Sequence, residues 1–444
     1  MTLLKSLFYI DHLSIIMMLL VGFVAACVAS FSSRYLQGDR KKPAFYGYLV
    51  MLILSVFTMV CADNIILLYI SWAMSNGVLT RLMIHKREWR AALHSSRMAL
   101  GNFAIGLICA GFAFALLYYD TQQTSIRAII IEASHESSVS LISAVLLLLA
   151  AMTQSALFPF HRWLLSSLNS PTPVSAIMHA GLVNGGGFLF ARFAPILAEY
   201  TMILHVMFIM GLVTALLGTL WKLMQSDVKR MLACSTMGQM GFMVVQCGLG
   251  LFPAAIAHLC WHGLFKAYLF FASGSAAQEK RLDLHYPPSF MHSVSALICG
   301  LCGAAAFAYV SGKSLIATDT TLFLTLIAFV TSAQFALPLV RNAHHVALPL
   351  ALLGTTLAGA AYGCSVHMIE QLLEPMHISY VQPLNILHII GFLVLAFAWS
   401  MLTFRRRDGN MPYPQWMMKH YVKMLNASQP HPLTVTAHRN HYQY

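Results

Sequence analysis

Apolar stretches of twenty residues or more recur along almost the whole chain, and they constrain its fold more than any other feature. A bilayer core is about 30 Å thick, so a helix of about 20 apolar residues crosses it. Because lipid offers no hydrogen-bonding partners, each spanning stretch must be helical. We predict an all-α polytopic membrane protein with thirteen spans, at residues 12–33, 43–62, 64–84, 98–119, 139–160, 173–198, 202–225, 231–251, 253–275, 292–312, 320–340, 345–365 and 384–404.

Composition and charge agree with a membrane location. Of the 444 residues, 58% are hydrophobic and 9% are charged, whereas about a quarter of an ordinary soluble domain is charged. The net charge of +12 does not indicate nucleic-acid binding, because the basic residues lie mostly in short loops. We read the first apolar run, residues 13–31, as a span and not a signal peptide, since no small-residue cleavage site follows it.

The loops also predict the orientation. Alternate loops carry most of the Lys and Arg residues, and such loops face the cytoplasm. The other side receives only Lys5, Arg127, Arg192 and Lys313. We therefore expect a multi-pass protein of the bacterial inner membrane with a periplasmic N-terminus and a cytoplasmic C-terminus.

Residues 139–195 do not read as two ordinary spans. Pro159, Pro171 and Pro173 crowd the middle of this stretch together with His161. A proline inside a helix removes a hydrogen bond and clashes with the preceding turn. Transporters place such broken helices near the midplane, where they line polar cavities. We predict a broken helix here.

One helical face within the membrane carries three ionisable side chains. His258, His262 and Lys266 are spaced i, i+4, i+8, which places them on one side of a helix. Ionisable groups inside spans are costly and usually mark an ion path, and histidine titrates near neutral pH, so this face predicts proton passage. Two alternatives remain: histidines bonded to neighbouring helices, and a metal site, for which neither a third ligand nor the H-E-x-x-H glutamate is evident.

Six further residues are candidates for the same path. They are His179, Lys229, Ser235, Thr236, Gln239 and Asp63. For His179, path and packing are equally open, and Lys229 could instead form a structural pair with Asp227. Ser235, Thr236 and Gln239 offer hydrogen bonds to a water chain. Asp63 lies at the outer entry to a span, where helix capping is at least as good an explanation.

Several longer motifs follow one another between residues 9 and 275. They are YIDHLS at 9–14, DNIILLY at 63–69, SALFPFHRWL at 155–164, PTPVSAIMHA at 171–180, SDVKRMLACSTMGQMG at 226–241 and HLCWHGLFK at 258–266. In this order they resemble the proton-translocating subunits of the NADH dehydrogenase subunit L and cation antiporter-like family. The resemblance implies an all-helical transporter core with inverted repeats.

The chain departs from this family at the positions assigned to pumping. Ala73 stands where the family carries a glutamate after tryptophan, and Gln154 stands where it carries a lysine. The second broken helix has no convincing match beyond residue 285, and Lys313 is at best a remnant of its lysine. The His258, His262 and Lys266 face remains.

The stretches HAGLVNGGGF at 179–188 and QCGLG at 246–250 resemble one branch of that family. This branch is the DabB-type membrane subunit of the Dab complex, which accumulates inorganic carbon as bicarbonate. The resemblance implies a large zinc-binding, carbonic-anhydrase-like partner of the DabA type, which hydrates CO2 to bicarbonate. The chain itself would be a transport and energy-coupling subunit and not an enzyme, with no cofactor of its own and zinc in the partner.

We therefore expect a proton-conducting subunit that energises this partner. The alternative is a proton-translocating subunit of an NADH-quinone oxidoreductase, a membrane hydrogenase or an Mrp-type cation/proton antiporter; the missing glutamate and lysine argue against it. A non-conducting membrane anchor is a third class. We expect H⁺ as the ion, since no carboxylate cage for Na⁺ is visible, although the sequence leaves both open.

Three parts follow from this interpretation. Residues 1–275 form the antiporter-like core, residues 276–404 form divergent C-terminal transmembrane helices, and residues 405–444 form a cytoplasmic tail. The tail begins with three arginines and carries aromatic anchors such as Trp416 and Tyr421. We predict that it docks on the cytosolic partner and is ordered by it; a basic tail lying on anionic lipid is the alternative. Its prolines predict an extended backbone at residues 428–432.

Overall fold

Helices make up almost all of the structure. The computed structural model describes residues 7–86, 88–133, 137–275, 288–342, 347–404 and 414–435. Ten helical segments among these are long and apolar enough to cross a membrane. Three more helices, α7 (Ser138–Gln154), α13 (Val228–Gly248) and α14 (Phe252–Ala272), coincide with the remaining predicted spans. The prediction of an all-α polytopic membrane protein is confirmed.

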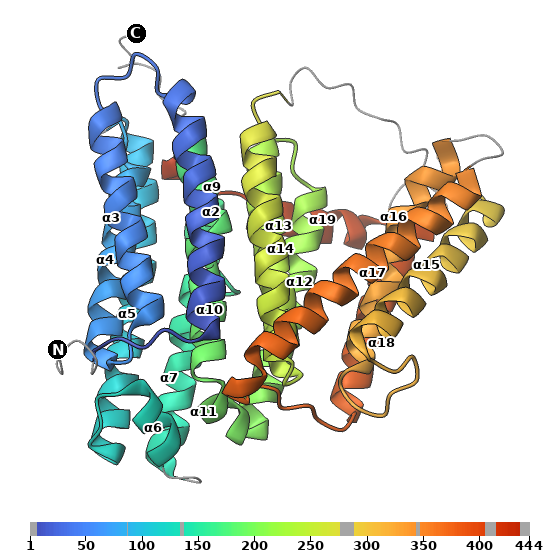
Figure 1. The fold of residues 1–444 in the computed structure, drawn as a ribbon. Coiled ribbons are helices and arrows are strands. Elements are labelled where there is room, and N and C mark those ends of the chain that lie inside the picture. The colour runs from blue at the N-terminus through green and yellow to red at the C-terminus, as the bar shows by residue number, and fades with distance from the viewer. Residues whose placement is uncertain are drawn as a thin grey trace. The chain divides into compact units, whose positions relative to one another are not determined.

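The chain forms two compact units. Unit 1 contains residues 1–248, 258–278 and 418–444, and unit 2 contains residues 249–257 and 279–417. Residues 276–287 and 405–413, where we expected the two domain boundaries, lie outside the described residues. The other helices of unit 1 (Figure 1) are α2 (His12–Tyr35), α3 (Lys42–Cys61), α4 (Ile65–Met83), α5 (Arg90–Thr121), α6 (Ile126–Glu132), α8 (Arg162–Leu165), α9 (Thr172–Ala180), η1 (Leu182–Asn184), α10 (Gly185–Arg192), α11 (Ala194–Glu199) and α12 (Thr201–Leu223).

A buried ion pair ties the start of α2 to the end of α10. The Asp11 side chain caps α2 by accepting from the Ser14 backbone N–H at 2.8 Å, and it also pairs with Arg192, which is 7% exposed. Arg192 Nη2 donates in addition to the carbonyl oxygen of Val60 at the end of α3. Arg192, which we counted among the basic residues of the loops, therefore links α2, α3 and α10.

The third predicted span, which polar residues weaken, is a continuous helix. Within α4, Ser71 Oγ donates to the Leu67 carbonyl oxygen at 2.7 Å, and Ser75 Oγ donates to that of Trp72 at 2.8 Å. A serine that bonds the preceding turn of its own helix leaves no unsatisfied polar group. These serines are therefore compatible with a span.

The broken helix predicted in residues 139–195 is confirmed: Pro159 and Pro171 lie in the interruption between α7 and α9, and a further break lies beyond the prolines. Helix α7 ends at Gln154, before the predicted residue 160, and Pro173 lies in the first turn of α9, where a proline is tolerated. The further break falls at Gly181, between α9 and η1. The end of α7 provides hydrogen-bond donors for the backbone at this break. Gln154 Nε2 and Ser155 Oγ donate to the carbonyl oxygens of Leu182 and Val183 at 3.1 and 2.8 Å.

Glycines bring α12 and α13 into close contact. A Cβ atom on Gly218 would lie 2.4 Å from the backbone nitrogen of Gly238, and one on Gly241 would lie 2.4 Å from that of Ala215. Small residues of this kind let helix backbones approach within a membrane. The close pair holds α13, which carries several candidate residues, in a fixed position against α12.

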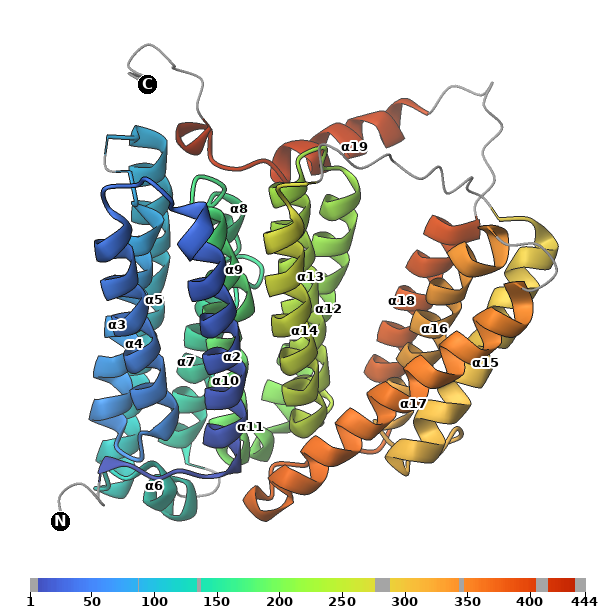
Figure 2. The same ribbon diagram turned by 45° about the horizontal axis from the view of Figure 1, so that its top comes forward.

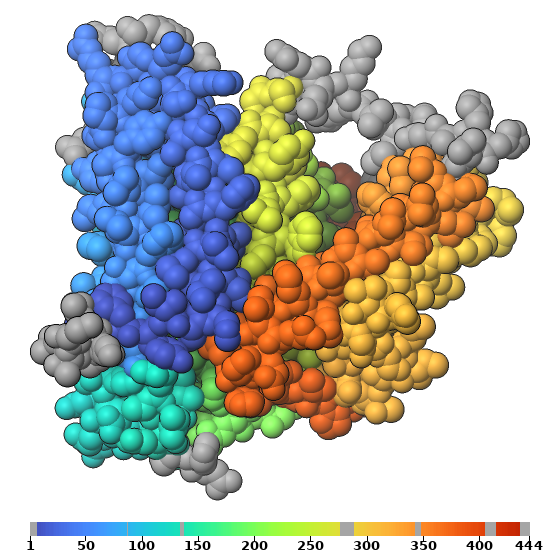
Figure 3. Space-filling model, in the orientation of Figure 1, coloured from blue at the N-terminus to red at the C-terminus, as the bar shows by residue number. Residues whose placement is uncertain are grey.

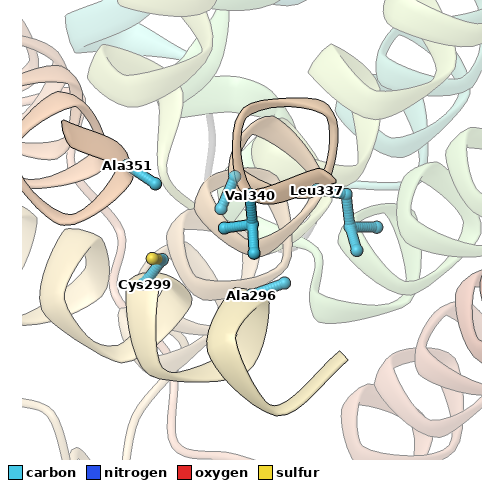
Figure 4. Packing of buried hydrophobic residues seen from close by; sticks show 6 residues of the cluster. Ala296, Cys299, Leu337, Val340 and Ala351 are labelled. Carbon is cyan, nitrogen blue, oxygen red and sulfur yellow. The ribbon is translucent and has the colours of Figure 1, made fainter. Parts of the chain in front are cut away.

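Unit 2 contains four long helices: α15 (Phe290–Ser311), α16 (Leu322–Asn342), α17 (Ala347–Leu373) and α18 (Ile386–Phe404), with the short η2 (Glu374–Met376) after α17. Helix α17 continues well beyond the predicted residue 365. Small and branched residues of α15, α16 and α17 pack together (Figure 4); the labelled ones are Ala296, Cys299, Leu337, Val340 and Ala351. The free Cys299 thus acts as a small apolar side chain.

Lys313 is not part of a broken helix. It follows the C-terminal end of α15, whose cap is Gly312 with φ = 67°. Its ammonium group pairs with Glu370 of α17 at 2.9 Å. In the described part of unit 2, the four long helices continue without a break comparable to that at Gly181.

The described part of the tail is ordered on the chain itself. Helix α19 (Gln415–Ala427) and the short η3 (Pro432–Thr434) lie at the end of unit 1 that also carries the α2–α3 and α12–α13 turns (Figure 2). His431 has extended backbone angles (φ = −58°, ψ = 133°), as the prolines predict, although a helical turn follows at once. Residues 405–413 and 436–444 lie outside the described residues. The docking of the tail on a partner stays a prediction.

Candidate ion-conduction site

Helix α14 carries the predicted polar face directly against the broken helix. Gly263 makes this possible, since a Cβ atom there would lie 2.8 Å from the carbonyl oxygen of Ala180. His262 and Lys266, on either side of this crossing, are 5% and 1% exposed. The close crossing therefore places ionisable side chains of α14 inside unit 1, beside the polar backbone where α9 ends.

A hydrogen-bonded chain joins three of the predicted residues. His179 Nδ1 lies 3.1 Å from Thr236 Oγ1, and Thr236 Oγ1 in turn donates to the carbonyl oxygen of Leu232 at 3.0 Å. The same carbonyl oxygen accepts from Lys266 Nζ at 3.1 Å. Thr236, on α13, thus connects His179 of α9 to Lys266 of α14 through one backbone oxygen.

This chain couples the tautomer of His179 to the Thr236 hydroxyl, which lies within hydrogen-bonding distance of both His179 Nδ1 and the Leu232 carbonyl oxygen. A threonine hydroxyl has a single proton. When that proton is donated to Leu232, Thr236 accepts from the N–H of His179 Nδ1, and Nε2 of a neutral His179 is a proton acceptor. The ring stacks on Phe270 with 4.5 Å between centroids, so packing holds its orientation.

His262 and His258 extend the row along α14. Their rings are nearly parallel, at 9°, with centroids 6.3 Å apart. Neither ring nitrogen of His262, nor Nε2 of His258, has a hydrogen-bond partner among the described residues. Lys266 follows His262 one turn further along the same face of α14, and it is joined to His179 through Leu232 and Thr236. We call these four ionisable side chains the row.

Lys229 lies at the start of α13, at one end of this arrangement. Its ammonium group donates to the carbonyl oxygen of Ser170 at 3.2 Å, in the segment just before α9. Asp227 instead caps the helix, because its Oδ1 accepts from the backbone N–H of Arg230 at 2.8 Å. The structural pairing of Lys229 with Asp227 is thus not what holds the lysine.

Of the remaining candidates, Gln239 touches the row through its backbone, which is hydrogen-bonded to His258, whereas Ser235 and Asp63 make no such bond to it among the described residues. Gln239 is exposed and Ser235 is half-buried. Asp63 is 4% exposed and accepts from Ser125 Oγ at 2.9 Å and from Arg127 Nη2 at 3.0 Å. This hydrogen bonding to Asp63 raises the pKa of Arg127. The contacts join the start of α4 to α6, which closes this end of the neighbouring helices (Figure 3, teal).

A neutral cluster occupies the place of the missing family charges. Gln154 Oε1 accepts from Trp72 Nε1 at 2.9 Å, and Gln154 Nε2 donates to Asn76 Oδ1 at 3.1 Å. All three side chains are buried. A small cavity lined by Trp72, Gln154 and Leu182 among others adjoins them. Trp72 and Asn76 are four residues apart on α4, a spacing that indicates one shared face, but the sequence does not show which residue they meet.

Metal ligands do not cluster in the described part of the chain. No group of three or more His, Cys, Asp or Glu side chains there is placed to hold a metal ion. The alternative of a metal on His258 and His262 therefore has no third ligand among the described residues.

The residues of this site lie in a region that matches a family model. The description of that model is NADH:quinone oxidoreductase/Mrp antiporter, TM, and it covers residues 62–287, about half of the chain. The chain belongs to this family. A second model, of the N-terminus of chain 5 of NADH-ubiquinone oxidoreductase (complex I), matches residues 4–46. The family identified from the motifs is confirmed, and with it a membrane subunit of the ion-transport, antiporter-like type.

Curated relatives include both kinds of subunit considered above. The chain is 36% identical over 292 residues to the probable inorganic carbon transporter subunit DabB1 of Halothiobacillus neapolitanus (strain ATCC 23641 / c2), which covers 64% of this chain and 52% of the relative. It is 31% identical over 349 residues to the chloroplastic NAD(P)H-quinone oxidoreductase subunit 5 of Chaetosphaeridium globosum, which covers 73% and 52%. The resemblance to DabB-type subunits is thus confirmed. The chain spans about half the length of these relatives.

A solved structure shows the same fold. A chain of the Mrp complex from Dietzia sp. DQ12-45-1b matches with a TM-score of 0.58 and 23% identity, over 95% of this chain and 48% of that one. The comparison supports an antiporter-like arrangement of the helices.

Proposed function

We propose that the chain is a proton-conducting membrane subunit that couples the proton-motive force to a partner zinc protein, which hydrates CO2 to bicarbonate. The observation that carries the conduction is the row of buried His179, Lys266 and His262 with half-buried His258. Ionisable groups at this depth are costly, and those that are present usually mark an ion path. Water can bridge polar groups that are too far apart for direct contact, so the row offers a proton successive acceptors.

The neutral cluster at Gln154 supports a subunit that lets protons flow down their gradient, and argues against one that pumps protons. A glutamine amide does not titrate, and the hydrogen bonds of Gln154 to Trp72, Asn76 and Leu182 engage both of its polar atoms. A charge pair that alternates between states is therefore replaced by a fixed contact. Conduction along the histidine row alone can carry protons down their gradient.

The likeness to a probable inorganic carbon transporter subunit supports the coupling to a DabA-type partner. In this proposal the zinc and the hydration chemistry belong to the partner, and this chain supplies the energy. Its N-terminus lies in the periplasm and its C-terminus in the cytoplasm of the inner membrane, with the basic turns facing the partner.

Proton flux through reconstituted protein tests the conduction. In vesicles with an imposed potassium diffusion potential, a pH-sensitive dye inside the lumen reports proton entry, and 22Na⁺ uptake reports sodium. We expect Lys266→Ala to abolish proton entry and Lys41→Ala, which changes a lysine before α3 whose side chain is 46% exposed, to preserve it. Equal flux in the two variants at equal incorporation, or sodium uptake in place of proton entry, would refute the assignment of the row.

Growth and co-purification test the coupling. In cells whose growth at ambient CO2 depends on this system, Lys266→Ala should prevent growth, and a protonophore should stop inorganic-carbon accumulation. The alternative, a module of a respiratory complex, is based on the likeness to an NAD(P)H-quinone oxidoreductase subunit. Co-purification of quinone-reducing subunits would establish that alternative, whereas a large zinc protein supports ours.

A further inference from the structure

Helix α19 separates apolar from basic residues around its axis. Its apolar side carries Met417, Met418, Tyr421, Val422, Met424 and Leu425, and its other side carries Gln415, Trp416, Lys419, His420, Lys423 and Asn426. Residues 409–444 contain no Asp or Glu. The helix is therefore amphipathic and purely basic, a pattern typical of helices that lie at a membrane surface.

The protein covers only part of the apolar side of α19. Met424 packs against the buried cluster formed by the ends of α8, α12 and α13. No residue of α19 is buried, and Met418, Tyr421 and Val422 are 46%, 46% and 47% exposed. A strip of apolar surface beside Met424 is thus left without cover from unit 1.

The position of α19 is fixed at the ends of membrane-spanning helices. Gln225 Nε2, in the α12–α13 turn, donates to Ser428 Oγ at 2.8 Å, and Arg230 Nη1 donates to Gln429 Oε1 at 3.1 Å. These bonds hold the C-terminal end of α19 at the level of that turn (Figure 2). Basic residues at the ends of spans lie at the level of the lipid headgroups, so α19 lies at the same depth.

A segment of the tail continues this contact toward the broken helix. Asn169 Nδ2 donates to the carbonyl oxygen of Thr434 at 2.7 Å, and the backbone N–H of His431 donates to Ser166 Oγ at 3.0 Å. Residues 428–434 of the tail are therefore held to unit 1 at the α12–α13 turn and at the segment between α8 and α9.

We propose that α19 is an interfacial membrane anchor, with Met418, Tyr421 and Val422 in the boundary between headgroups and acyl chains and with Lys419 and Lys423 among anionic headgroups. Lipid fits this surface better than a protein does, because a protein covering the apolar side would have to occupy the depth at which the bilayer lies. The charge agrees, since anionic headgroups attract basic segments near the surface. This anchor is independent of the proposed conduction.

Site-specific photocrosslinking of the full-length protein tests the anchor. The photoreactive residue p-benzoylphenylalanine replaces Tyr421 on the apolar side or, as the matched control, His420 on the opposite side. After irradiation of cell membranes, mass spectrometry of the peptide is expected to show phospholipid adducts at position 421 and none at 420. Protein adducts at 421, or equal lipid adducts at both positions, would overturn the proposal.

The lysines are tested with the same probe at position 421 in purified, reconstituted protein. Vesicles of phosphatidylcholine with phosphatidylglycerol are compared with vesicles of phosphatidylcholine alone. We expect a several-fold higher adduct yield with phosphatidylglycerol, and we expect Lys419→Glu with Lys423→Glu to remove this difference. An adduct yield that is the same with and without phosphatidylglycerol would refute the role of the lysines. A double variant that still gives a higher yield with phosphatidylglycerol would refute it as well. Unchanged elution of the double variant on size-exclusion chromatography shows that it is folded.

Discussion

Replacing Gln154 by leucine should destabilise the protein much more than a single lost hydrogen bond does. Leucine has a similar volume but leaves three buried groups without their partner: Trp72 Nε1, Asn76 Oδ1 and the Leu182 carbonyl oxygen. An unsatisfied buried polar group costs about 1–3 kcal/mol. The three groups together give about 3–9 kcal/mol, and we expect the lower part of this range, about 3–5 kcal/mol.

Ser155→Ala is the matched control for this change. It lies one residue further along and removes one bond, to the Val183 carbonyl oxygen at 2.8 Å, which should cost about 1–2 kcal/mol. The assay heats detergent-solubilised protein and measures the fraction that stays monodisperse on size-exclusion chromatography. We expect the midpoint shift of Gln154→Leu to be about three times that of Ser155→Ala. If the two shifts are equal, Gln154 does not hold the cluster together.

Three further outcomes are expected. Thr236→Val keeps the side-chain shape but removes the hydroxyl that accepts from His179, so dye-detected proton flux should fall sharply while the thermal midpoint shifts less than in Gln154→Leu; retained flux contradicts the chain. Arg127→Gln leaves the buried carboxylate of Asp63, which is 4% exposed, without its charge partner. Because the arginine is half exposed, the free energy of unfolding measured by thermal denaturation should fall by about 1–3 kcal/mol; an unchanged value would show that the pair does not stabilise the protein. Deletion of residues 426–444 should lower co-purification of the zinc protein, and full yield would show that the tail is not its docking segment.

Much of the fold was predictable, because spanning helices depend on local apolar content. The histidine face of α14 was predictable for a similar reason, since a helical spacing of four fixes which side chains share a face. The positions of helix breaks and caps were less predictable. The prolines indicated the interruption before α9, but they did not indicate the break at Gly181, and Pro173 lies in the first turn of a helix.

The partners of the site residues could not be predicted from local patterns. Thr236 connects two members of the row because α9 brings His179 next to it, whereas the side chain of Gln239, three residues later, is exposed. Asp63 meets Arg127 across 64 positions of sequence. Such contacts depend on packing between distant helices, which a single sequence does not encode in any short motif.

The bonds between the end of α7 and the broken helix limit how the protein can move during transport. Two consecutive side chains, Gln154 and Ser155, bind two consecutive carbonyl oxygens, of Leu182 and Val183. This double attachment makes α7 and the segment after Gly181 one mechanical element. The glycine contacts make α12 and α13 another. Helix α14 contacts both elements, through Lys266 on Leu232 of α13 and through Gly263 beside Asn184. We therefore expect any rearrangement that follows protonation of the row to move these two elements as units and not to separate the helices within either one.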